Sequence, residues 1–386
     1  MAKQDAEFDI IVYGASGFTG RLVAEYLAKQ GVGKWAMAGR SLSKLAEVRD
    51  EMGLPSDTPL VIADASNPAT LIDMCNRTRV VLTTVGPYQL YGKELVAACA
   101  ETGTDYVDLC GEPAWMREMI DAHDARAKET GARIVFSCGF DSIPFDLGVW
   151  FLQQEANKRH GKPAPRVKGR VRKMQGGASG GTIASLTETM KAAAKNPKII
   201  GILKSSFGLT PGFEGPSQPS GLLPEYDSAT GTWTAPFVMA PINTKNVHRS
   251  NFLLGHPYGR DFVYDEMIMT TIGDAGRAMA EAMAKASPFG DSKLQPGEGP
   301  SKEERENGFY DVLFIGEYPD GTSVRVSVSG DKDPGYGSTS KMIAESALTL
   351  LENDTAGGVT TPGAVMAAPL LARLEKNAGL TFLVEG

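Results

Sequence analysis

Short apolar runs and amphipathic stretches alternate along the first 150 residues. The apolar runs have the length of buried strands, and they occupy residues 8–14, 35–40, 59–64, 79–86, 105–111 and 133–140. Between them, apolar residues recur at helical spacing in residues 21–31, 41–53, 93–103 and around 114–130. Strands and helices that alternate in this way predict an α/β fold, with a doubly wound parallel sheet covered by helices on both faces.

The pattern changes after about residue 150. Basic residues alternate with other residues along 166–176, and residues 310–331 have the pattern of a hairpin that turns at Pro-Asp-Gly. An amphipathic helix is predicted over residues 341–352, and the tail is predicted to form a helix and a short strand. We therefore expect a second, α+β domain with a mixed or antiparallel sheet. The predicted division is residues 1–150, 151–335 and 336–386.

Composition and charge restrict the class of protein. The formal net charge of −7 argues against a nucleic-acid surface or an anionic membrane partner. No apolar run reaches the roughly 18 residues of a membrane span, and the polar, acidic first residues do not resemble a signal peptide. Cys75, Cys99, Cys110 and Cys138 form no CxxC pair and have no histidine at metal-binding spacing. These features predict a cytoplasmic protein with reduced thiols, no metal and a small-molecule substrate, and they leave a homodimer open.

A glycine-rich turn follows the first predicted strand and opens the first predicted helix. Gly14 permits a tight turn, Gly17 lets a pyrophosphate approach the backbone, and Gly20 lets the helix pack on the strand. Free backbone N–H groups at the helix N-terminus then face the phosphates. The alternative is a glycine turn with no ligand. We predict a dinucleotide site of the Rossmann type at residues Gly14, Ala15, Ser16, Gly17, Phe18, Thr19 and Gly20.

The end of the second predicted strand selects the dinucleotide. An NAD site usually places a carboxylate about 20 residues after the glycines, where it accepts from the ribose 2′-hydroxyl. This chain has Arg40 there, followed by Ser41, with Lys44 close behind. A guanidinium pairs with a 2′-phosphate, so the sequence predicts NADP(H) as the cofactor. The alternative is that Arg40 is a solvated turn residue.

Two further strand ends are predicted to contact the cofactor. Asp64 closes the third predicted strand, where the adenine would lie. The fourth strand ends in Val85, Gly86, Pro87 and Tyr88. Ligands of open parallel sheets bind beyond the carboxyl ends of the strands, so this segment is expected to line the nicotinamide half of the site.

Several longer segments carry a family resemblance. They include YGASGFTGRLVAEYL, AGRSLSKL, TTVGPYQLYGKELVAACAETGTDYVDLCGE, CGFDSIPFDLG, SGGTIAS, HPYGRDFVYDE and DPGYGSTSKM. With these segments the chain resembles the saccharopine dehydrogenase-like oxidoreductases, and within them the bacterial trans-acting enoyl reductases. The resemblance implies an N-terminal Rossmann domain that binds NADP(H), a central domain on a mixed sheet and a C-terminal segment that returns to the Rossmann side. It does not by itself assign the substrate, which has to be argued from the site.

Side chains near the predicted strand ends are candidates for proton donors. Tyr88 follows the fourth strand, Asp141 follows the sixth, and Tyr336 precedes the C-terminal helix. We predict these three residues as catalytic, because reduction of an enoyl or carbonyl group needs a positioned acid beside the nicotinamide. The alternative for Tyr88 is packing on the cofactor or at the domain interface. The alternative for Asp141 is capping of the helix that begins near Pro144.

Gly111 and Glu112, at the end of the fifth predicted strand, are further cofactor contacts. The alternative for Glu112 is a role at the start of the helix that follows Pro113. Substrate contacts are predicted at Ser142 and at the loop made of Ser179, Gly180, Gly181 and Thr182. Glycines before a helix N-terminus can hold a carboxylate, a thioester or a phosphate, and the alternative is a simple loop capped by threonine.

The class of substrate is left between two kinds. Arg166, Lys168, Arg170 and Arg172 could hold the carboxylates of a saccharopine-type substrate, but their alternation favours a solvated strand face. The loop at residues 198–213 and four methionines, Met267, Met269, Met279 and Met283, favour an apolar, lipid-like or acyl substrate with an unsaturated or carbonyl group. The alternatives are a saccharopine-type imine or amino-acid oxidoreductase and a protein that binds NADPH without catalysis.

Overall fold

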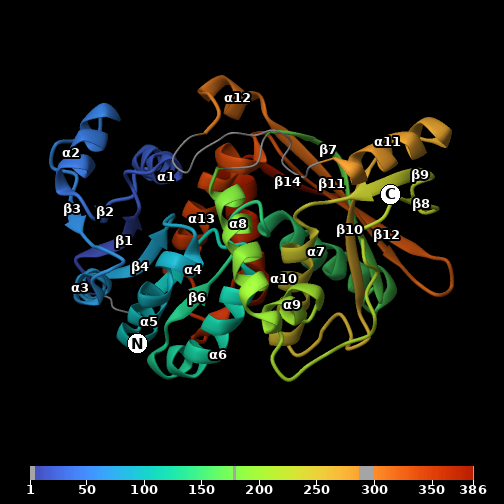
Figure 1. Cartoon of the computed structure of the whole chain (residues 1–386), viewed down its shortest axis with the longest axis horizontal. Helices are drawn as coiled ribbons and strands as arrows, with labels where there is room; N and C mark the ends of the chain where they lie inside the picture. Colours follow the sequence, from blue (N-terminus) through green and yellow to red (C-terminus); the bar gives the residue numbers. More distant parts are fainter. Residues whose placement is uncertain (1–4, 177–179, 287–298, 386) are drawn as a thin grey trace.

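Two seven-stranded sheets organise the chain, which is seen in a computed structural model that describes residues 5–176, 180–286 and 299–385 (Figure 1). In the first, here called the parallel sheet, the strand order is β13-β6-β5-β4-β1-β2-β3 and all neighbours run parallel. The strands are β1 (Phe8–Tyr13), β2 (Trp35–Gly39), β3 (Leu60–Ile62), β4 (Thr78–Thr83), β5 (Asp105–Val107), β6 (Arg133–Val135) and β13 (Gly358–Thr360). The predicted doubly wound sheet of the Rossmann type is confirmed.

Four of the helices between these strands are the predicted ones, and two more, after β3 and β4, were not predicted. They are α1 (Phe18–Lys29), α2 (Leu42–Glu51), α3 (Pro68–Asn76), α4 (Tyr88–Tyr91), α5 (Lys93–Thr102) and α6 (Pro113–Thr130). Ser41 caps α2 as predicted, since its hydroxyl accepts from the backbone N–H of Lys44. Helix α1 begins at Phe18, earlier than the predicted residue 21, because Gly17 is its N-cap and Gly20 already belongs to its first turn.

The second sheet, here called the mixed sheet, has the order β14-β12-β11-β7-β10-β9-β8. Its strands are β7 (Arg166–Gln175), β8 (Glu225–Asp227), β9 (Thr232–Pro236), β10 (Val263–Met269), β11 (Phe309–Glu317), β12 (Ser323–Gly330) and β14 (Leu380–Val384). Strands β7 and β10 pair in parallel, while the other neighbours are antiparallel. The predicted hairpin is the β11–β12 pair, and the predicted mixed or antiparallel sheet is confirmed.

The basic run on β7 is a network of ion pairs, so its interpretation as a solvated strand face is wrong. Arg170 is fully buried between two carboxylates, with Nε 2.6 Å from an oxygen of Asp227 and Nη1 2.9 Å from an oxygen of Asp265. Lys168 also pairs with Asp227. The guanidinium of Arg172 pairs with Asp311 and with Glu385. Alternation alone did not reveal these carboxylates because they come from strands and loops far away in the sequence. Because these cations already pair with carboxylates of the protein, they do not favour binding of a substrate carboxylate.

The remaining helices lie between the two sheets and at their outer edges (Figure 1). They are α7 (Ile143–His160), α8 (Gly180–Lys195), α9 (Pro197–Lys204), α10 (Ala240–Leu253), α11 (Gly273–Lys285), α12 (Lys302–Asn307), α13 (Thr339–Glu352), α14 (Pro362–Val365) and α15 (Ala367–Arg373), with short π-helical segments η1 (Pro334–Ser338) and η2 (Leu374–Ala378). Helix α7 packs closely on β11, because a Cβ at Gly148 would lie only 2.4 Å from the ring of Phe314.

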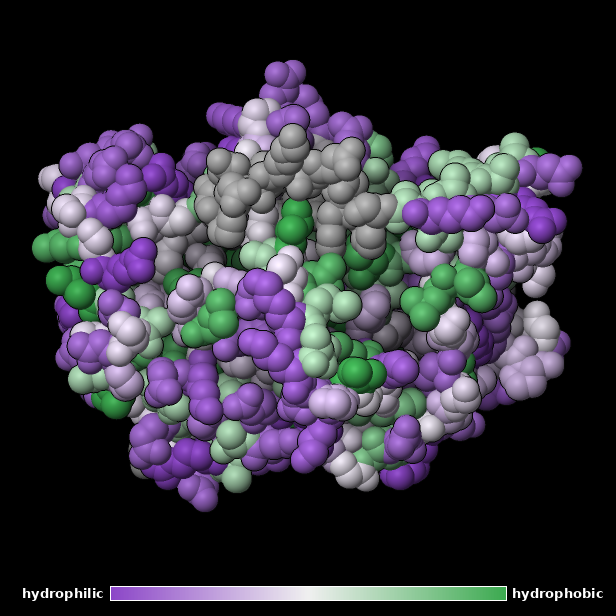
Figure 2. Space-filling view, in the orientation of Figure 1, coloured by the Kyte–Doolittle hydropathy of each residue, from purple (hydrophilic) through white to green (hydrophobic). Residues whose placement is uncertain are grey.

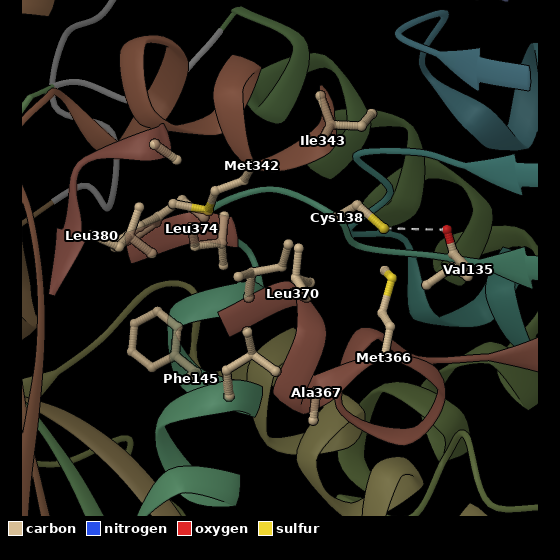
Figure 3. Close-up of a cluster of buried hydrophobic side chains, with 14 of the residues drawn as sticks. Val135, Cys138, Phe145, Met342, Ile343, Met366, Ala367, Leu370, Leu374 and Leu380 are labelled. Carbon is tan, nitrogen blue, oxygen red and sulfur yellow. Dashed lines mark hydrogen bonds between the residues drawn. The ribbon is translucent and has the colours of Figure 1, made fainter. Parts of the chain in front are cut away.

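The C-terminal segment joins both sheets. Strand β13 extends the parallel sheet beside β6, and β14 extends the mixed sheet beside β12. Figure 3 shows the apolar cluster between them, in which Met342 of α13 and Leu370 of α15 lie near Phe145 of α7 and Leu380 of β14. The boundaries predicted at residues 150 and 335 stay a prediction. Within the described residues, no helix is both long and apolar enough to cross a membrane.

Candidate functional site

A cavity of about 630 Å³ lies at the carboxyl ends of the strands of the parallel sheet. This is the edge where ligands of open α/β sheets bind. The segments after β1, β4, β5 and β6 form one wall, and the end of β7, α8, α9, the segment before α10 and η1 form the other. On the face in Figure 2, hydrophobic side chains reach the surface between polar ones in the middle of the molecule.

The wall is mostly apolar. Its residues include Phe18, Leu109, Phe140, Met174, Leu186, Met190, Leu203, Phe237, Met239 and Ile242. Among the described residues that line the cavity, Lys245 is the single cation and Asp141 the single carboxyl group. Met267 is instead buried in β10, and Met279 is exposed on α11, so the methionines of the wall are not those singled out from the sequence.

The glycine-rich turn has the geometry of a phosphate site. Gly14 has a φ of 91°, in the left-handed region that favours glycine, and a Cβ at Gly20 would lie 2.1 Å from the carbonyl oxygen of Gly14. The turn therefore seats the N-terminus of α1 directly on β1. The first turn of α1 has no acidic residue, and Gly17, Phe18 and Thr19 line the cavity. The Gly17 N–H donates to the Gly14 carbonyl within the turn, and the N-terminus of α1 that follows borders a space that suits an anion.

Arg40 is exposed at the carboxyl end of β2. Within the described residues its guanidinium has no hydrogen bond or ion pair, which leaves it available to a 2′-phosphate. Ser41 caps α2, and Lys44 pairs with Glu47. Asp64, at the end of β3, accepts from the N–H and the hydroxyl of Ser66, and these bonds lower the pKa of its carboxyl.

Tyr88 and Glu112 form one buried hydrogen-bonded unit. The Tyr88 hydroxyl donates to the carbonyl of Thr83 and accepts from the N–H of Leu109, which joins the ends of β4 and β5. The Glu112 carboxylate accepts from the N–H groups of Tyr88 and Gln89 at 2.8 and 2.9 Å, so it caps the short helix α4 rather than α6. The geometry of both residues favours a structural role, although Tyr88 also lines the cavity.

The buried carboxyl group of Asp108 links the ends of β5 and β6. Asp108 accepts from the N–H groups of Cys110 and Ser137 and from the hydroxyl of Tyr106. Its burial raises the pKa of the carboxyl to about 7. Burial also raises the pKa of the Cys110 thiol well above its usual value, which makes this cysteine unreactive.

Asp141 lies in the cavity wall just before α7. Its Oδ1 atom is buried and has no hydrogen-bond partner among the described residues, and burial raises the pKa of the carboxyl to about 7. The N-cap of α7 is Ser142, so the alternative interpretation of Asp141 as a helix cap is wrong. The Ser142 hydroxyl is buried and accepts from the side-chain amide of Asn246, which lies on α10. That bond directs Ser142 toward α10.

The residues predicted around Tyr336 lie together. Tyr336 packs edge-on against Phe18, with ring centroids 4.8 Å apart, and its hydroxyl accepts from the N–H of Gly180. Gly180, Gly181 and Thr182 form the first turn of α8 rather than a loop, and the latter two line the cavity. Ser179 lies outside the described residues.

Lys245 of α10 was not found from the sequence. It lies in a run of polar residues, PINTKNVHRSN, that has no apolar stripe, so its helix was not predicted. In the structure it is buried, and its ammonium donates to the carbonyls of Leu203 and Pro241 at 2.9 and 2.8 Å. This lysine differs from a solvated one because α10 packs beside the cavity, and that position depends on the tertiary fold.

Comparison with known proteins assigns the chain to a family. The model of the saccharopine dehydrogenase NADP-binding domain matches residues 10–135. A Mycobacterium tuberculosis protein is 42% identical over 97% of each chain. The trans-acting enoyl reductases of Mycobacterium ulcerans and Mycobacterium bovis are 39% and 38% identical, over 98% and 97% of each chain. The chain belongs to the family of the trans-acting enoyl reductases.

The family and the geometry agree on the cofactor. As a trans-acting enoyl reductase relative, the chain is an NADP-dependent oxidoreductase with an NADP-binding domain. The open N-terminus of α1 fits the pyrophosphate and the exposed Arg40 fits a 2′-phosphate, so the residues present suit NADP(H). The fold resembles that of apo saccharopine dehydrogenase (L-Glu forming) from Saccharomyces cerevisiae, with a TM-score of 0.54, 11% identity and coverage of 98% and 100%.

Proposed function

We propose that this protein reduces the carbon–carbon double bond of an enoyl thioester with NADPH. The observation that carries the proposal is the cavity beside the glycine-rich turn, whose described wall is apolar apart from hydroxyls, one cation and one carboxyl group. An acyl chain suits such a wall, whereas a saccharopine-type substrate carries several carboxylates and would need several cations. The names of the 38–39% identical relatives support the same reaction.

In this proposal the cofactor supplies a hydride. The residues of α1 and Arg40 bind its phosphates, and Gly86 and Gly111, which line the cavity without bulky side chains, give its reactive end room. Asp141 is the proposed proton donor, because its buried carboxyl has a pKa near 7 and is therefore neutral in a large fraction of molecules at neutral pH. Tyr336 is the second candidate, since its phenol lines the same cavity beside Phe18.

The apolar wall excludes water from the reacting carbons and binds the acyl chain. Leu186 and Met190 of α8 line the cavity and are also exposed, so they form its mouth. A thioester whose acyl group enters there keeps its carrier outside the protein. A cytoplasmic location and a homodimer remain predictions.

The proposal is tested by following the absorbance of NADPH with two sets of substrates. One set holds trans-2-enoyl thioesters of increasing chain length, and the other pairs an amino acid with an aldehyde or a keto acid. We expect oxidation with the enoyl thioesters, and faster oxidation as the chain grows from short to medium length because more of the apolar wall is covered. Oxidation with the amino-acid pairs alone would establish the saccharopine-type reaction instead. Thermal stabilisation by NADPH without oxidation in either set would establish a binding protein.

A further inference from the structure

Lys245 is a buried cation without an anionic partner. Its ammonium lies in the cavity wall, and within the described residues no carboxylate forms an ion pair with it. The two bonds to the carbonyls of Leu203 and Pro241 fix the ammonium between the end of α9 and the start of α10. An ammonium has three donors, so one N–H has no partner among the described residues.

Burying a cation in this way is costly. Taking an ammonium out of water disfavours the charged form, and the pKa of Lys245 falls to about 8 as a result. Its neighbour on α10, His248, is held neutral because burial and the nearby ammonium lower the pKa of the imidazole to about 3, and an imidazole can carry only positive charge, so His248 does not balance the ammonium. A methionine at this position would fill similar volume at lower cost. The arrangement is explained if a ligand brings negative charge to the remaining N–H.

We propose that Lys245 binds the thioester oxygen of the substrate and stabilises the negative charge that gathers there during reduction. This inference rests on the proposed function and adds the residue that completes it. Hydride addition at Cβ breaks the C=C π bond, and its electron pair moves to the thioester as an enolate. The enolate oxygen accepts the third N–H of Lys245. The electron pair then returns to form the bond between Cα and the proton from Asp141, whose carboxylate regains a proton from solvent.

The composition of the cavity wall supports separate roles for Asp141 as proton donor and Lys245 as the group that stabilises the enolate. Asp141 is the one carboxyl group and Lys245 the one cation among the described lining residues, and a step that makes an enolate and then protonates it needs one group of each kind. The hydroxyl of Tyr88 is bonded to two backbone groups, which leaves the lysine as the better donor to an oxyanion.

The experiment compares wild-type protein with Lys245→Met and Lys245→Arg, and with the matched control Lys204→Met. Lys204 is an exposed lysine at the end of α9 that does not line the cavity. With an enoyl thioester that wild type reduces, we expect kcat to fall by about 100- to 1,000-fold in Lys245→Met. We expect Lys245→Arg to recover part of this loss and Lys204→Met to behave as wild type. NADPH titration followed by fluorescence checks that each variant is folded and binds the cofactor with unchanged affinity.

A second readout does not depend on turnover. An acetoacetyl thioester forms an enolate whose ultraviolet absorbance differs from that of its keto form. With NADP⁺ present, wild type is expected to raise the enolate absorbance of this probe at neutral pH, and Lys245→Met is expected to leave it as in buffer. If both Lys245 variants fail to bind NADPH, the probe is measured with wild type across pH, and the absence of an enolate band overturns the inference.

The outcomes separate the two proposals. A Lys245→Met protein that binds NADPH and keeps kcat within threefold of wild type overturns the role of Lys245 and leaves the enoyl reductase reaction standing. If the wild-type protein fails to oxidise NADPH with every enoyl thioester tested, the proposed reaction is overturned, and this inference is overturned with it.

Discussion

At the residue scale, we propose that the preference for NADPH over NADH depends on one exposed side chain. Arg40 lies at the end of β2 where a carboxylate would select NAD(H), and it has no ion pair among the described residues. Hydrogen bonds to charged groups contribute about 1.5–3 kcal/mol, so Arg40→Asp is expected to weaken NADPH binding by roughly 10- to 100-fold. The measurement is the Kd of NADPH and of NADH by fluorescence. Lys34→Asp, an equal charge change at the opposite end of β2, is the control. An unchanged preference for NADPH in Arg40→Asp would show that the 2′-phosphate is read elsewhere.

Asp141 is predicted to make both stability and activity depend on pH. Its carboxyl stays neutral in the folded state up to a pKa of about 7, whereas in the unfolded chain it ionises near its usual pKa of 3.8. Between these values the unfolded state binds fewer protons, so the unfolding free energy falls as pH rises from about 4 to about 7 and is then level. In Asp141→Asn the side chain does not ionise, so position 141 no longer lowers the unfolding free energy as pH rises. We expect Asp141→Asn to be more stable than wild type by a few kcal/mol above pH 7, and close to wild type near pH 4.

Denaturant titrations of both proteins at several pH values measure this difference. Asp108, which also has a raised pKa near 7, is present in both proteins, so its contribution cancels. In wild type, kcat/KM is expected to fall as pH rises above 7, because the Asp141 donor is then ionised, and to fall more steeply above about pH 8, where Lys245 also loses its proton. A difference in stability that does not change with pH would mean that the Asp141 carboxyl is ionised in the folded protein.

The proposed cofactor residues are easier to predict from the sequence than the proposed catalytic residues. The glycine turn and Arg40 are recognisable because each stands at a fixed distance from a strand end. Glu112 was placed at the correct strand end, yet its carboxylate caps α4, a contact that no local pattern shows. Lys245 was not predicted, because within a run of polar residues the sequence does not distinguish a buried lysine from a solvated one.

At the element scale, the N-terminus of α1 is held against β1 by the absence of a side chain. A Cβ at Gly20 would approach the Gly14 carbonyl oxygen to 2.1 Å, and the backbone would have to separate. We therefore expect Gly20→Ala to weaken NADPH binding by at least about tenfold, since the helix N-terminus moves away from the phosphates. Gly33→Ala is the matched control, because a Cβ there meets nothing within 4 Å. Equal NADPH affinity in the two variants, measured by fluorescence titration, would show that α1 does not bind the phosphates.

Element types were predictable where the pattern is periodic. The sequence pattern predicted strands β1 to β7, β11, β12 and β14 and helices α1, α2, α5, α6 and α13, with bounds that differ by a few residues. It did not predict strands β8, β9, β10 and β13. Helix α10 was missed because its buried residues include Asn243, Asn246 and Arg249, which a sequence pattern places on the surface. The ion pairs of β7 were also missed, because their carboxylate partners are remote in the sequence.

At the scale of the whole molecule, the C-terminal helix α13 connects the parallel sheet to the last strand. Glu345 of α13 is fully buried and accepts from the hydroxyl of Tyr26 on α1 at 2.6 Å and from Nε of Arg373 on α15 at 2.7 Å. Removing one partner of a buried pair costs about 3–5 kcal/mol, so Glu345→Ala is expected to lower the unfolding free energy by that amount. Glu352→Ala, which removes the exposed partner of the same arginine, is expected to cost less than about 1 kcal/mol.

Denaturant unfolding followed by circular dichroism measures both variants. A single transition that shifts as a whole is expected in Glu345→Ala, because β13 and β14 join the C-terminal segment to both sheets. Equal effects of the two substitutions would show that Glu345 does not connect α1 to the C-terminal segment.

We propose that an enoyl thioester is reduced by NADPH in the cavity at the carboxyl edge of the parallel sheet. The most direct measurement is the transfer of deuterium to an enoyl thioester from NADPH that carries deuterium at both C4 positions of the nicotinamide, followed by mass spectrometry of the acyl product. We expect one deuterium in the saturated product, located at Cβ, with one NADPH consumed for each molecule formed. Consumption of NADPH with no deuterium in the acyl chain, or no consumption with any enoyl thioester, would contradict the account.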